Sequence, residues 1–160
     1  MTHDTITSSE PFPSILVVED SNEDFEAFQR LLRRSSCNIP IQRCANGDQA
    51  LDFLYQRGKY QEQQNEFLPG LIVLDLNLPG TDGREVLRQV KQEKKLRAIP
   101  IVIFTTSDSP KDIEDCYQYG VNSYIVKPID FAQLKRDIQV LVDYWFNVTT
   151  LPCKQRMNHG

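Results

Sequence analysis

Short apolar runs alternate with amphipathic stretches along most of the chain. Five runs have the length of strands and lie at 14–20, 40–44, 70–76, 99–106 and 123–126. Two of them, GLIVLDL and IPIVIFTT, are almost continuously apolar, as expected for strands covered on both faces. Between and after the runs, apolar side chains recur at helical spacing, as in the stripe Ile113, Cys116 and Tyr117. Ser109 and Pro110 predict the cap and the first turn of that helix, and the last helix should run through Phe146 or beyond. The pattern therefore predicts five strands that alternate with five helices.

The order of these elements predicts the fold class. Strands that alternate with helices form βαβ units, which place parallel strands in one sheet and helices on both of its faces. We therefore expect an α/β fold: a flavodoxin-like, doubly wound five-stranded parallel sheet with strand order 2-1-3-4-5. Ligands of such sheets bind beyond the carboxyl ends of the strands, near the first and third strands.

The length of the chain favours one domain. Its 160 residues, of which 40% are hydrophobic and 25% are charged, suffice to bury one core. We expect a flexible N-terminal segment at 1–12, the α/β domain at 13–148 and a C-terminal tail at 149–160. The polar stretch 57–68 predicts a surface loop or an extension of the preceding helix.

Charge and composition argue against several classes of protein. The net charge is −4 and no Lys/Arg cluster stands apart from acidic residues, so we expect no nucleic-acid binding. No signal peptide is evident, and no apolar run approaches the roughly 20 residues that span a bilayer. The four cysteines form no CxxC pair, which argues against a zinc site or a disulfide scaffold. We expect a cytoplasmic protein without membrane association.

Polar residues stand where four of the predicted strands end. They are Glu19 and Asp20 after the first strand, Asp75 and Asn77 after the third, Thr105 after the fourth and Lys127 after the fifth. Because the carboxyl ends of parallel strands meet at one edge of the sheet, these side chains should converge. Crowded carboxylates repel one another unless a cation lies among them. An all-oxygen site with few carboxylates favours Mg²⁺, or Mn²⁺, over zinc.

This set of residues has the parts needed for phosphoryl transfer. A carboxylate can act as the nucleophile and form an acyl phosphate. The transition state spreads negative charge over three oxygens, which need positive or hydrogen-bonding partners. The metal ion, the ammonium group of Lys127 and the hydroxyl of Thr105 with nearby backbone N–H groups would supply them.

Four motifs carry a resemblance to a known family. They are LVVED at the first strand, IVLDLNLPGTDG at the third, PIVIFTTS at the fourth and YIVKP at the fifth. The chain resembles the response-regulator receiver domains of two-component signalling over residues 15–142. Within the family, DLNLPGTDGREVL and the polar insert before it resemble single-domain regulators paired with phytochrome-type histidine kinases.

The resemblance implies a function and a metal site. Asp75 would be the phospho-acceptor for the phosphohistidine of a sensor histidine kinase. Asp20 and Asp75 would bind Mg²⁺ directly with the backbone carbonyl of Asn77, and Glu19 would hold the ion through water. Such a protein catalyses its own phosphorylation and dephosphorylation, but it is a signalling protein and not an enzyme.

The resemblance also implies a switch. Thr105 would be the hydroxyl that moves toward the phosphoryl group, and Lys127 would pair with Asp75 or its phosphate. Tyr124, three residues before Lys127, would turn inward when the threonine moves.

Simpler interpretations stay open for single residues. Glu19 and Asp20 could cap the first helix, since acids favour a helix N-terminus. Asp75 could turn a loop, and Thr105, Tyr124 and Lys127 could be ordinary strand and loop residues.

Other functions fit the sequence less well. An aspartyl-nucleophile phosphatase of the haloacid-dehalogenase type needs a second acid two residues after the nucleophile, where this chain has Asn77. A flavodoxin needs a phosphate loop after the first strand, where this chain has EDSNED. A receiver-fold interaction scaffold that is not phosphorylated would not need the intact set of acids, threonine and lysine.

The last helix carries more apolar residues than one buried face requires. One stripe has core character, and a second stripe beside it consists of Val140, Tyr144 and Val148. Exposed apolar patches usually mark an interface, so we expect a homodimer through this helix and the neighbouring fourth helix and fifth strand. Alternatively, the tail folds back over the patch.

Overall fold

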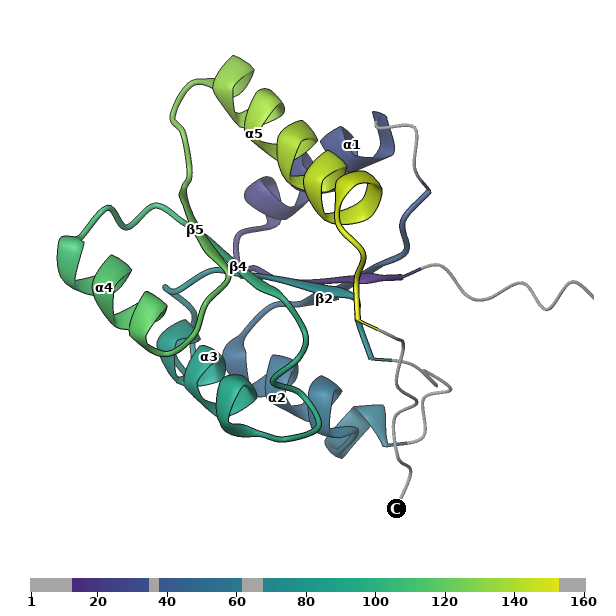
Figure 1. Ribbon diagram of the computed structural model, residues 1–160, viewed down its shortest axis with the longest axis vertical. Helices are drawn as coiled ribbons and strands as arrows, with labels where there is room; N and C mark the ends of the chain where they lie inside the picture. Colours follow the sequence, from purple (N-terminus) through teal and green to yellow (C-terminus); the bar gives the residue numbers. More distant parts are fainter. Residues whose placement is uncertain (1–12, 35–37, 62–67, 153–160) are drawn as a thin grey trace, which may run out of the picture.

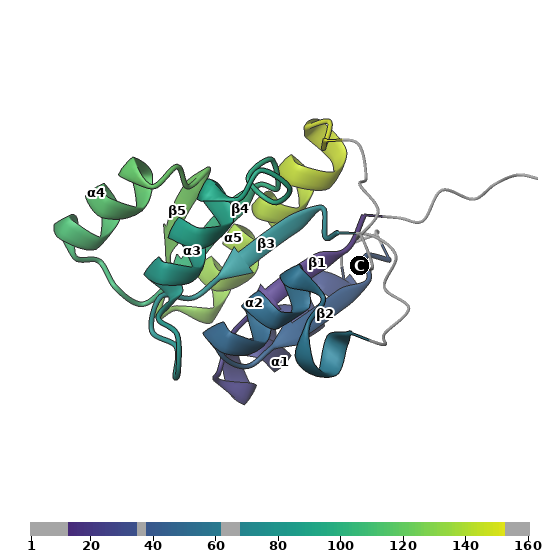
Figure 2. The same cartoon turned by 90° about the horizontal axis from the view of Figure 1, so that it is seen from below.

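The computed structural model describes residues 13–34, 38–61 and 68–152. Its centre is a five-stranded parallel sheet with the order β2-β1-β3-β4-β5, as the sequence predicted. The strands are β1 (Ile15–Val18), β2 (Ile41–Cys44), β3 (Leu71–Leu74), β4 (Ile101–Thr105) and β5 (Ser123–Val126). Figure 2 shows β1 and β3 side by side in the sheet. They are the pair at which ligands of doubly wound sheets bind.

Helices cover both faces of the sheet. They are α1 (Asn22–Arg34), α2 (Gly47–Tyr55), α3 (Gly83–Gln92), α4 (Pro110–Gln118) and α5 (Phe131–Asp143), with a 3₁₀ turn η1 (Gly58–Tyr60) and a π-helical turn η2 (Tyr144–Val148). In Figure 1, α1 and α5 lie on one face, and α2, α3 and α4 lie on the other. The α/β fold class and the helices on both faces are therefore confirmed.

Two apolar clusters, one on each face of the sheet, form the core. Alternate residues of β1 face opposite sides, so Leu16 belongs to the cluster under α2 and α3, and Val17 belongs to the cluster under α1 and α5. All residues of β1, β3 and β4 are buried, which explains why these strands are continuously apolar in sequence. Apolar side chains fill both faces of the sheet, so the edge where the strands end is the place left for polar side chains.

Side-chain caps determine where the helices begin. Ser21 accepts a hydrogen bond from the amide of Asp24 at 3.2 Å at the start of α1. Ser109 caps α4 with Pro110 at the first helical position, as predicted, and Asp130 caps α5. Because Ser21 provides the cap of α1, the interpretation of Glu19 and Asp20 as simple helix caps is wrong.

Two details differ from the sequence prediction or extend it. Tyr117, expected in the buried stripe of α4, is 50% exposed, because only Cys116 of that helix is fully buried against the sheet. The last helix continues past α5 as the π-helical turn η2, so the helical segment runs beyond Phe146 as expected.

Within the described part of the chain, no helix has the length and apolar character needed to span a membrane. The predicted flexible segment 1–12 lies outside the described residues.

Candidate functional site

The register of the strands brings the predicted site residues to one edge. Val18, the last residue of β1, is paired with Leu74, the last residue of β3. The amide of Asp75 donates to the carbonyl of Val18 at 3.0 Å, so the residues that follow both strands leave the sheet together. On the other side, the amide of Lys127 donates to the carbonyl of Thr105 at 2.7 Å.

Three carboxylates meet at this edge. Oxygen atoms of Glu19, Asp20 and Asp75 all lie within 4.8 Å of one another. Glu19 and Asp75 are buried, whereas Asp20 is exposed. The Oε2 atom of Glu19 is buried and has no hydrogen-bond partner among the described residues. A buried oxygen without a donor is costly, and a divalent cation would satisfy it together with the two aspartates. The residues therefore fit a Mg²⁺ or Mn²⁺ ion.

Lys127 provides the positive charge of the site. Its ammonium group, on a side chain that is 9% exposed, hydrogen-bonds Glu19 and lies 3.0 Å from Oδ2 of Asp75. It also donates to Oδ2 of Asp24 in the first turn of α1 at 2.9 Å. Asp24 was not among the predicted site residues. Its position in the first turn of the helix that follows β1 is a sequence signal that could have identified it.

The buried charges shift one another's pKa values. Burial is the largest cause that raises the pKa of Glu19 to about 8, and a hydrogen bond with Asp75 adds to it, against the opposing effect of Lys127. Burial also acts to raise the pKa of Asp75, but hydrogen bonds from Glu19, Lys127 and Thr105 and the charge of Lys127 outweigh it. The pKa of Asp75 is therefore below its ordinary value. Asp75 remains an anion near neutral pH, as a nucleophile must.

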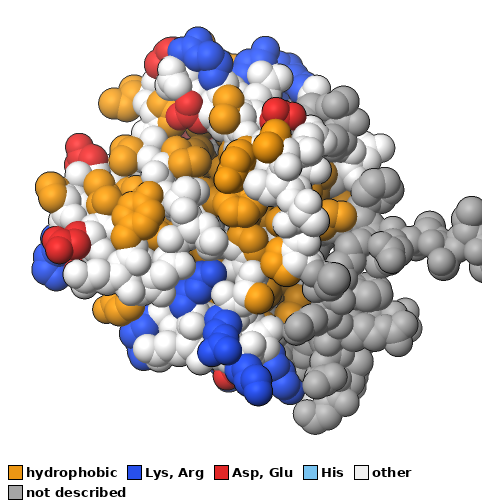
Figure 3. Space-filling model, in the orientation of Figure 1, with side chains coloured by type: hydrophobic (Ala, Val, Ile, Leu, Met, Phe, Trp, Pro, Cys, Tyr) orange, Lys and Arg blue, Asp and Glu red, His pale blue; other side chains and the backbone are white. Residues whose placement is uncertain are grey.

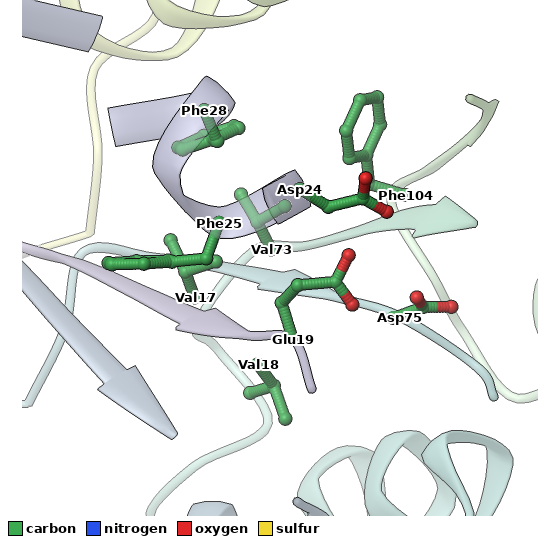
Figure 4. A pocket seen from close by; sticks show the side chains of 9 residues that line it. All are labelled: Val17, Val18, Glu19, Asp24, Phe25, Phe28, Val73, Asp75 and Phe104. Atoms are coloured by element: carbon green, nitrogen blue, oxygen red, sulfur yellow. The ribbon is translucent and has the colours of Figure 1, made fainter. Parts of the chain in front are cut away.

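A small pocket beside the carboxylates has an apolar wall. Figure 4 shows Glu19, Asp24 and Asp75 around this pocket, with Phe25 and Phe104 among its other lining residues. The ammonium group of Lys127 lies 5.8 Å from the centre of the Phe104 ring. Apolar side chains at this position limit access of water from the α1 side and strengthen the electrostatic interactions among the charged groups.

The turn after β3 holds the backbone next to Asp75 in a fixed path. A Cβ atom at Gly83 would lie 2.1 Å from the carbonyl oxygen of Asp75, so no other residue fits there without movement of the backbone. In the same turn, Thr81 hydrogen-bonds Asp48 at the start of α2. The amide of Asn77 donates to Oδ1 of Asp75 at 3.2 Å. The loop thus orients the carboxylate of Asp75 and keeps Asn77 beside it.

The connection from β4 to α4 links Thr105 to Tyr124. Thr105 is fully buried beside Asp75, whose pKa it helps to lower, and its hydroxyl accepts the amide of Ser107 at 3.4 Å. Tyr124 is half-buried, packs against the core and donates its hydroxyl to the carbonyl oxygen of Ser107 at 2.8 Å. Burial raises the pKa of Tyr124, so its hydroxyl stays protonated as a donor. Tyr124 is therefore connected to the site through Ser107.

The structure brings together Glu19, Asp20, Asp75, Thr105 and Lys127. Val140, Tyr144 and Val148, which the sequence predicted for a dimer interface, lie on the exposed side of α5 and η2.

Comparison with known proteins agrees with this geometry. A response regulator receiver domain matches residues 15–139. The chain belongs to the response regulator receiver domain family. Response regulator Rcp1 of Synechocystis sp. is 39% identical to it over 144 residues, which cover 90% of this chain and 96% of Rcp1.

Other relatives match over nearly the full length. The probable methanogenesis regulatory protein FilR2 of Methanothrix harundinacea is 38% identical over 149 residues, 93% of each chain. The Mn²⁺-bound form of Rcp1 superimposes with a TM-score of 0.83 at 38% identity, over 88% of this chain and 99% of that one. The phosphorylated cyanobacterial phytochrome response regulator RcpA gives a TM-score of 0.83 at 35% identity, over 89% and 99%.

The resemblance noted in the sequence is thus confirmed, as is the flavodoxin-like receiver fold. The protein is a response regulator of two-component signalling, and its three carboxylates fit a divalent ion such as Mg²⁺ or Mn²⁺. It is a signalling protein.

Proposed function

We propose that Asp75 accepts the phosphoryl group from the phosphohistidine of a sensor histidine kinase. The observation that carries this proposal is the position of the Asp75 carboxylate, which lies within hydrogen-bond reach of Lys127 and Thr105 and beside Glu19 and Asp20. Of the two buried carboxyl groups, Asp75 has a lowered pKa and Glu19 has a raised pKa. Of the buried pair, Asp75 is therefore the better nucleophile at neutral pH.

The metal ion is assigned to the three carboxylates. Asp20 and Asp75 would bind Mg²⁺ or Mn²⁺ directly with the backbone carbonyl of Asn77, and Glu19 would hold it through water. When bound, the ion neutralises negative charge on the phosphoryl oxygens. Lys127 provides the second positive charge, and the hydroxyl of Thr105 provides a hydrogen bond.

The transfer is a substitution at phosphorus. A carboxylate oxygen of Asp75 forms the new P–O bond while the P–N bond of the phosphohistidine breaks. The electron pair of the broken bond stays on the imidazole nitrogen, which takes up a proton. Hydrolysis by water later breaks the P–O bond and restores Asp75, so the protein would also catalyse its own dephosphorylation.

Thr105 and Tyr124 are assigned to the switch. A phosphoryl group on Asp75 adds about −1.5 to −2 charges and offers the Thr105 hydroxyl a stronger acceptor. Because Ser107 contacts both Thr105 and Tyr124, a shift of the threonine changes the support for the inward position of Tyr124. The output would be a change in the surface around α4 and β5.

We further propose a homodimer through the outer face of α5. Val140, Tyr144 and Val148 are 68%, 50% and 67% exposed, and Val126 of β5 is 40% exposed. Figure 3 shows apolar side chains gathered in the middle of this face, over α5, β5 and α4. Leu151 of the tail lies against Gly70, so the described part of the tail does not run over this face. A second copy of the chain fits a contiguous apolar patch of this kind.

The proposal also covers the kinase that donates the phosphoryl group and the compartment in which the protein acts. The likeness to the phytochrome response regulator RcpA supports a phytochrome-type histidine kinase as the phosphodonor. The receiver unit at 13–148 would act in the cytoplasm and would bind proteins and not nucleic acid or membrane.

Labelling with acetyl phosphate and Mg²⁺ tests the function. We expect one phosphoryl group per chain in the wild type and none in Asp75→Asn, with Asp52→Asn as a control that removes an acid of α2 outside the three-carboxylate cluster. Labelling of Asp75→Asn at the wild-type level would place the acceptor elsewhere. Absence of labelling in the wild type would favour an unphosphorylated scaffold.

A further inference from the structure

A second network of charged side chains lies where α3 meets α4, outside the carboxylate cluster. Arg84 of α3 donates from Nε to Oδ1 of Asp112 at 2.9 Å and from Nη2 to Oδ2 at 2.7 Å. Asp112 lies in the first turn of α4 and also accepts the hydroxyl of Ser107 at 2.6 Å. One carboxylate thus joins two helices and the connection that follows β4.

The geometry of this network is fixed on both sides. The two parallel hydrogen bonds from the guanidinium group restrict the orientation of the Asp112 carboxylate. Arg84 is held in turn by Asp82, the cap of α3. The side chain of Asp112 is 19% exposed, whereas Lys111 and Asp115 form a pair on the same helix with 84% and 36% exposure. The Arg84–Asp112 pair is therefore shielded, and the Lys111–Asp115 pair is an ordinary surface pair.

Ser107 connects this pair to the phosphoryl site. Its hydroxyl binds Asp112, its carbonyl oxygen accepts the hydroxyl of Tyr124, and its amide donates to the hydroxyl of Thr105. Thr105 lies beside Asp75 and helps to lower the pKa of that carboxyl. The carboxylate of Asp112 therefore restrains a residue that contacts both assigned switch groups.

We propose that Arg84 and Asp112 are positioning residues for phosphoryl acceptance, which hold Ser107 so that Thr105 and Tyr124 keep their inward positions. The inference rests on the proposed function of Asp75 and Thr105. Since coupling between sites is reciprocal, a phosphoryl group bound by Thr105 also strengthens the link between α3 and α4. The signal thereby reaches two helices by hydrogen bonds that are already formed.

Binding of beryllofluoride, a phosphoryl-group analogue, to the full chain with saturating Mg²⁺ tests the proposal. Asp112→Asn should weaken this binding by about fivefold or more, a normal size for coupling between sites. Asp115→Asn removes one negative charge from the same helix, and it should change the binding by less than about twofold. Both affinities can be measured by fluorine NMR titration.

Two further measurements separate positioning from general damage to the fold. The affinity for Mg²⁺ alone should be the same in Asp112→Asn and the wild type, because Asp112 does not contact the carboxylate cluster. Ser107→Ala keeps every charge and should weaken beryllofluoride binding in the same direction. If Asp112 acts through Ser107, the double variant should lose little more than the larger single loss.

Several results would overturn the inference. One is equal beryllofluoride affinity in Asp112→Asn and the wild type. Others are a parallel loss of Mg²⁺ affinity, or a double variant whose loss is the product of the two single losses. If the wild type itself binds no beryllofluoride, or binds it equally after Asp75→Asn, the proposed function fails, and this inference fails with it.

Discussion

The carboxyl edge of the sheet and the outer face of α5 depart in opposite ways from the usual distribution of residues. At the edge, Glu19, Asp75 and Lys127 are charged groups in buried positions. On α5 and η2, Val140 and Tyr144 are apolar groups in exposed positions. Buried charge must be paired, and a contiguous exposed apolar patch is unusual on a monomer, so both regions indicate function.

The two regions differ in what would complete them. The edge lacks only small groups, since Lys127 already pairs with Glu19 and Asp75, and one buried oxygen of Glu19 remains without a partner among the described residues. A single ion and a phosphoryl group are enough to fill it. The exposed apolar residues of α5 and η2 extend along a helix, and in the proposed homodimer a second copy of the chain would cover them. In the proposal, small-ligand chemistry and protein contact therefore use separate regions of the fold.

The largest effect should come from removal of the cation at the edge. Lys127→Ala leaves the carboxylates of Glu19 and Asp75 buried without a positive partner. We expect no labelling by acetyl phosphate and, without Mg²⁺, a free energy of unfolding lower by about 3 kcal/mol in urea. Lys111→Ala, in an exposed pair, should leave the urea midpoint nearly unchanged. Equal urea midpoints for Lys127→Ala and the wild type would contradict the account of paired buried charges.

The next effect concerns the proton on Glu19. Its pKa in the folded protein is raised from 4.5 to about 8. Between these two pH values the folded protein retains a proton that the unfolded chain has released. The metal-free protein should therefore lose stability as the pH rises from 4.5 to about 8. Between the two pH values the slope should approach about 1.4 kcal/mol per pH unit. The lowered pKa of Asp75 acts only at more acidic pH.

Urea unfolding at a series of pH values measures this slope. Glu19→Gln should remove most of it, and saturating Mg²⁺ should remove it in the wild type, since the ion takes the place of the proton. A slope that is unchanged in Glu19→Gln would assign the titration to another group.

A smaller effect is expected on the outer face of α5. Tyr144→Glu places a charge in the apolar patch and should weaken the homodimer by about tenfold or more, with little change in monomer stability. Ile129→Glu adds the same charge at a fully exposed apolar residue before α5 and serves as the control. Sedimentation equilibrium across micromolar concentrations measures both. A wild type that stays monomeric with and without beryllofluoride would remove the homodimer from the proposal.

The sequence predicted the sheet and the strand-end residues because both depend on local patterns. Continuous apolar runs define β3 and β4, and parallel strands necessarily bring Asp75, Thr105 and Lys127 to one edge. The exposed stripe of α5 was likewise visible as apolar residues in excess of one buried face.

Contacts between side chains of separate helices could not be predicted in this way. Asp24 meets Lys127 across 103 positions of sequence, and Arg84 meets Asp112 across 28. Each pair depends on how two elements sit on the sheet and on the rotamers of long side chains, for which the hydrophobic pattern carries no signal. The exposed position of Tyr117 was missed for the same reason, because the tilt of α4 on the sheet decides which of its residues are covered.

The substitution Asp24→Asn has the smallest predicted effect, and it tests how the acids at the carboxyl edge share Lys127. In the resting protein it competes for Lys127, whose ammonium group a phosphoryl group on Asp75 must recruit. Asp24 is 48% exposed, so the competition is partly screened by solvent. Asp24→Asn should therefore strengthen beryllofluoride binding by only about threefold, and the gain should shrink as salt is raised from 50 to 500 mM, values of roughly the range over which surface charges become screened.

Glu23→Gln provides the matched control for this experiment. Glu23 is the other acid in the first turn of α1, so its loss changes the net charge and the helix terminus in the same way. Only Asp24 of the two is bonded to Lys127. An equal gain in both variants would reduce the role of Asp24 to its general charge. Weaker binding in Asp24→Asn would mean that Asp24 holds Lys127 in the position that phosphoryl acceptance needs, and that the edge has four cooperating acids instead of three.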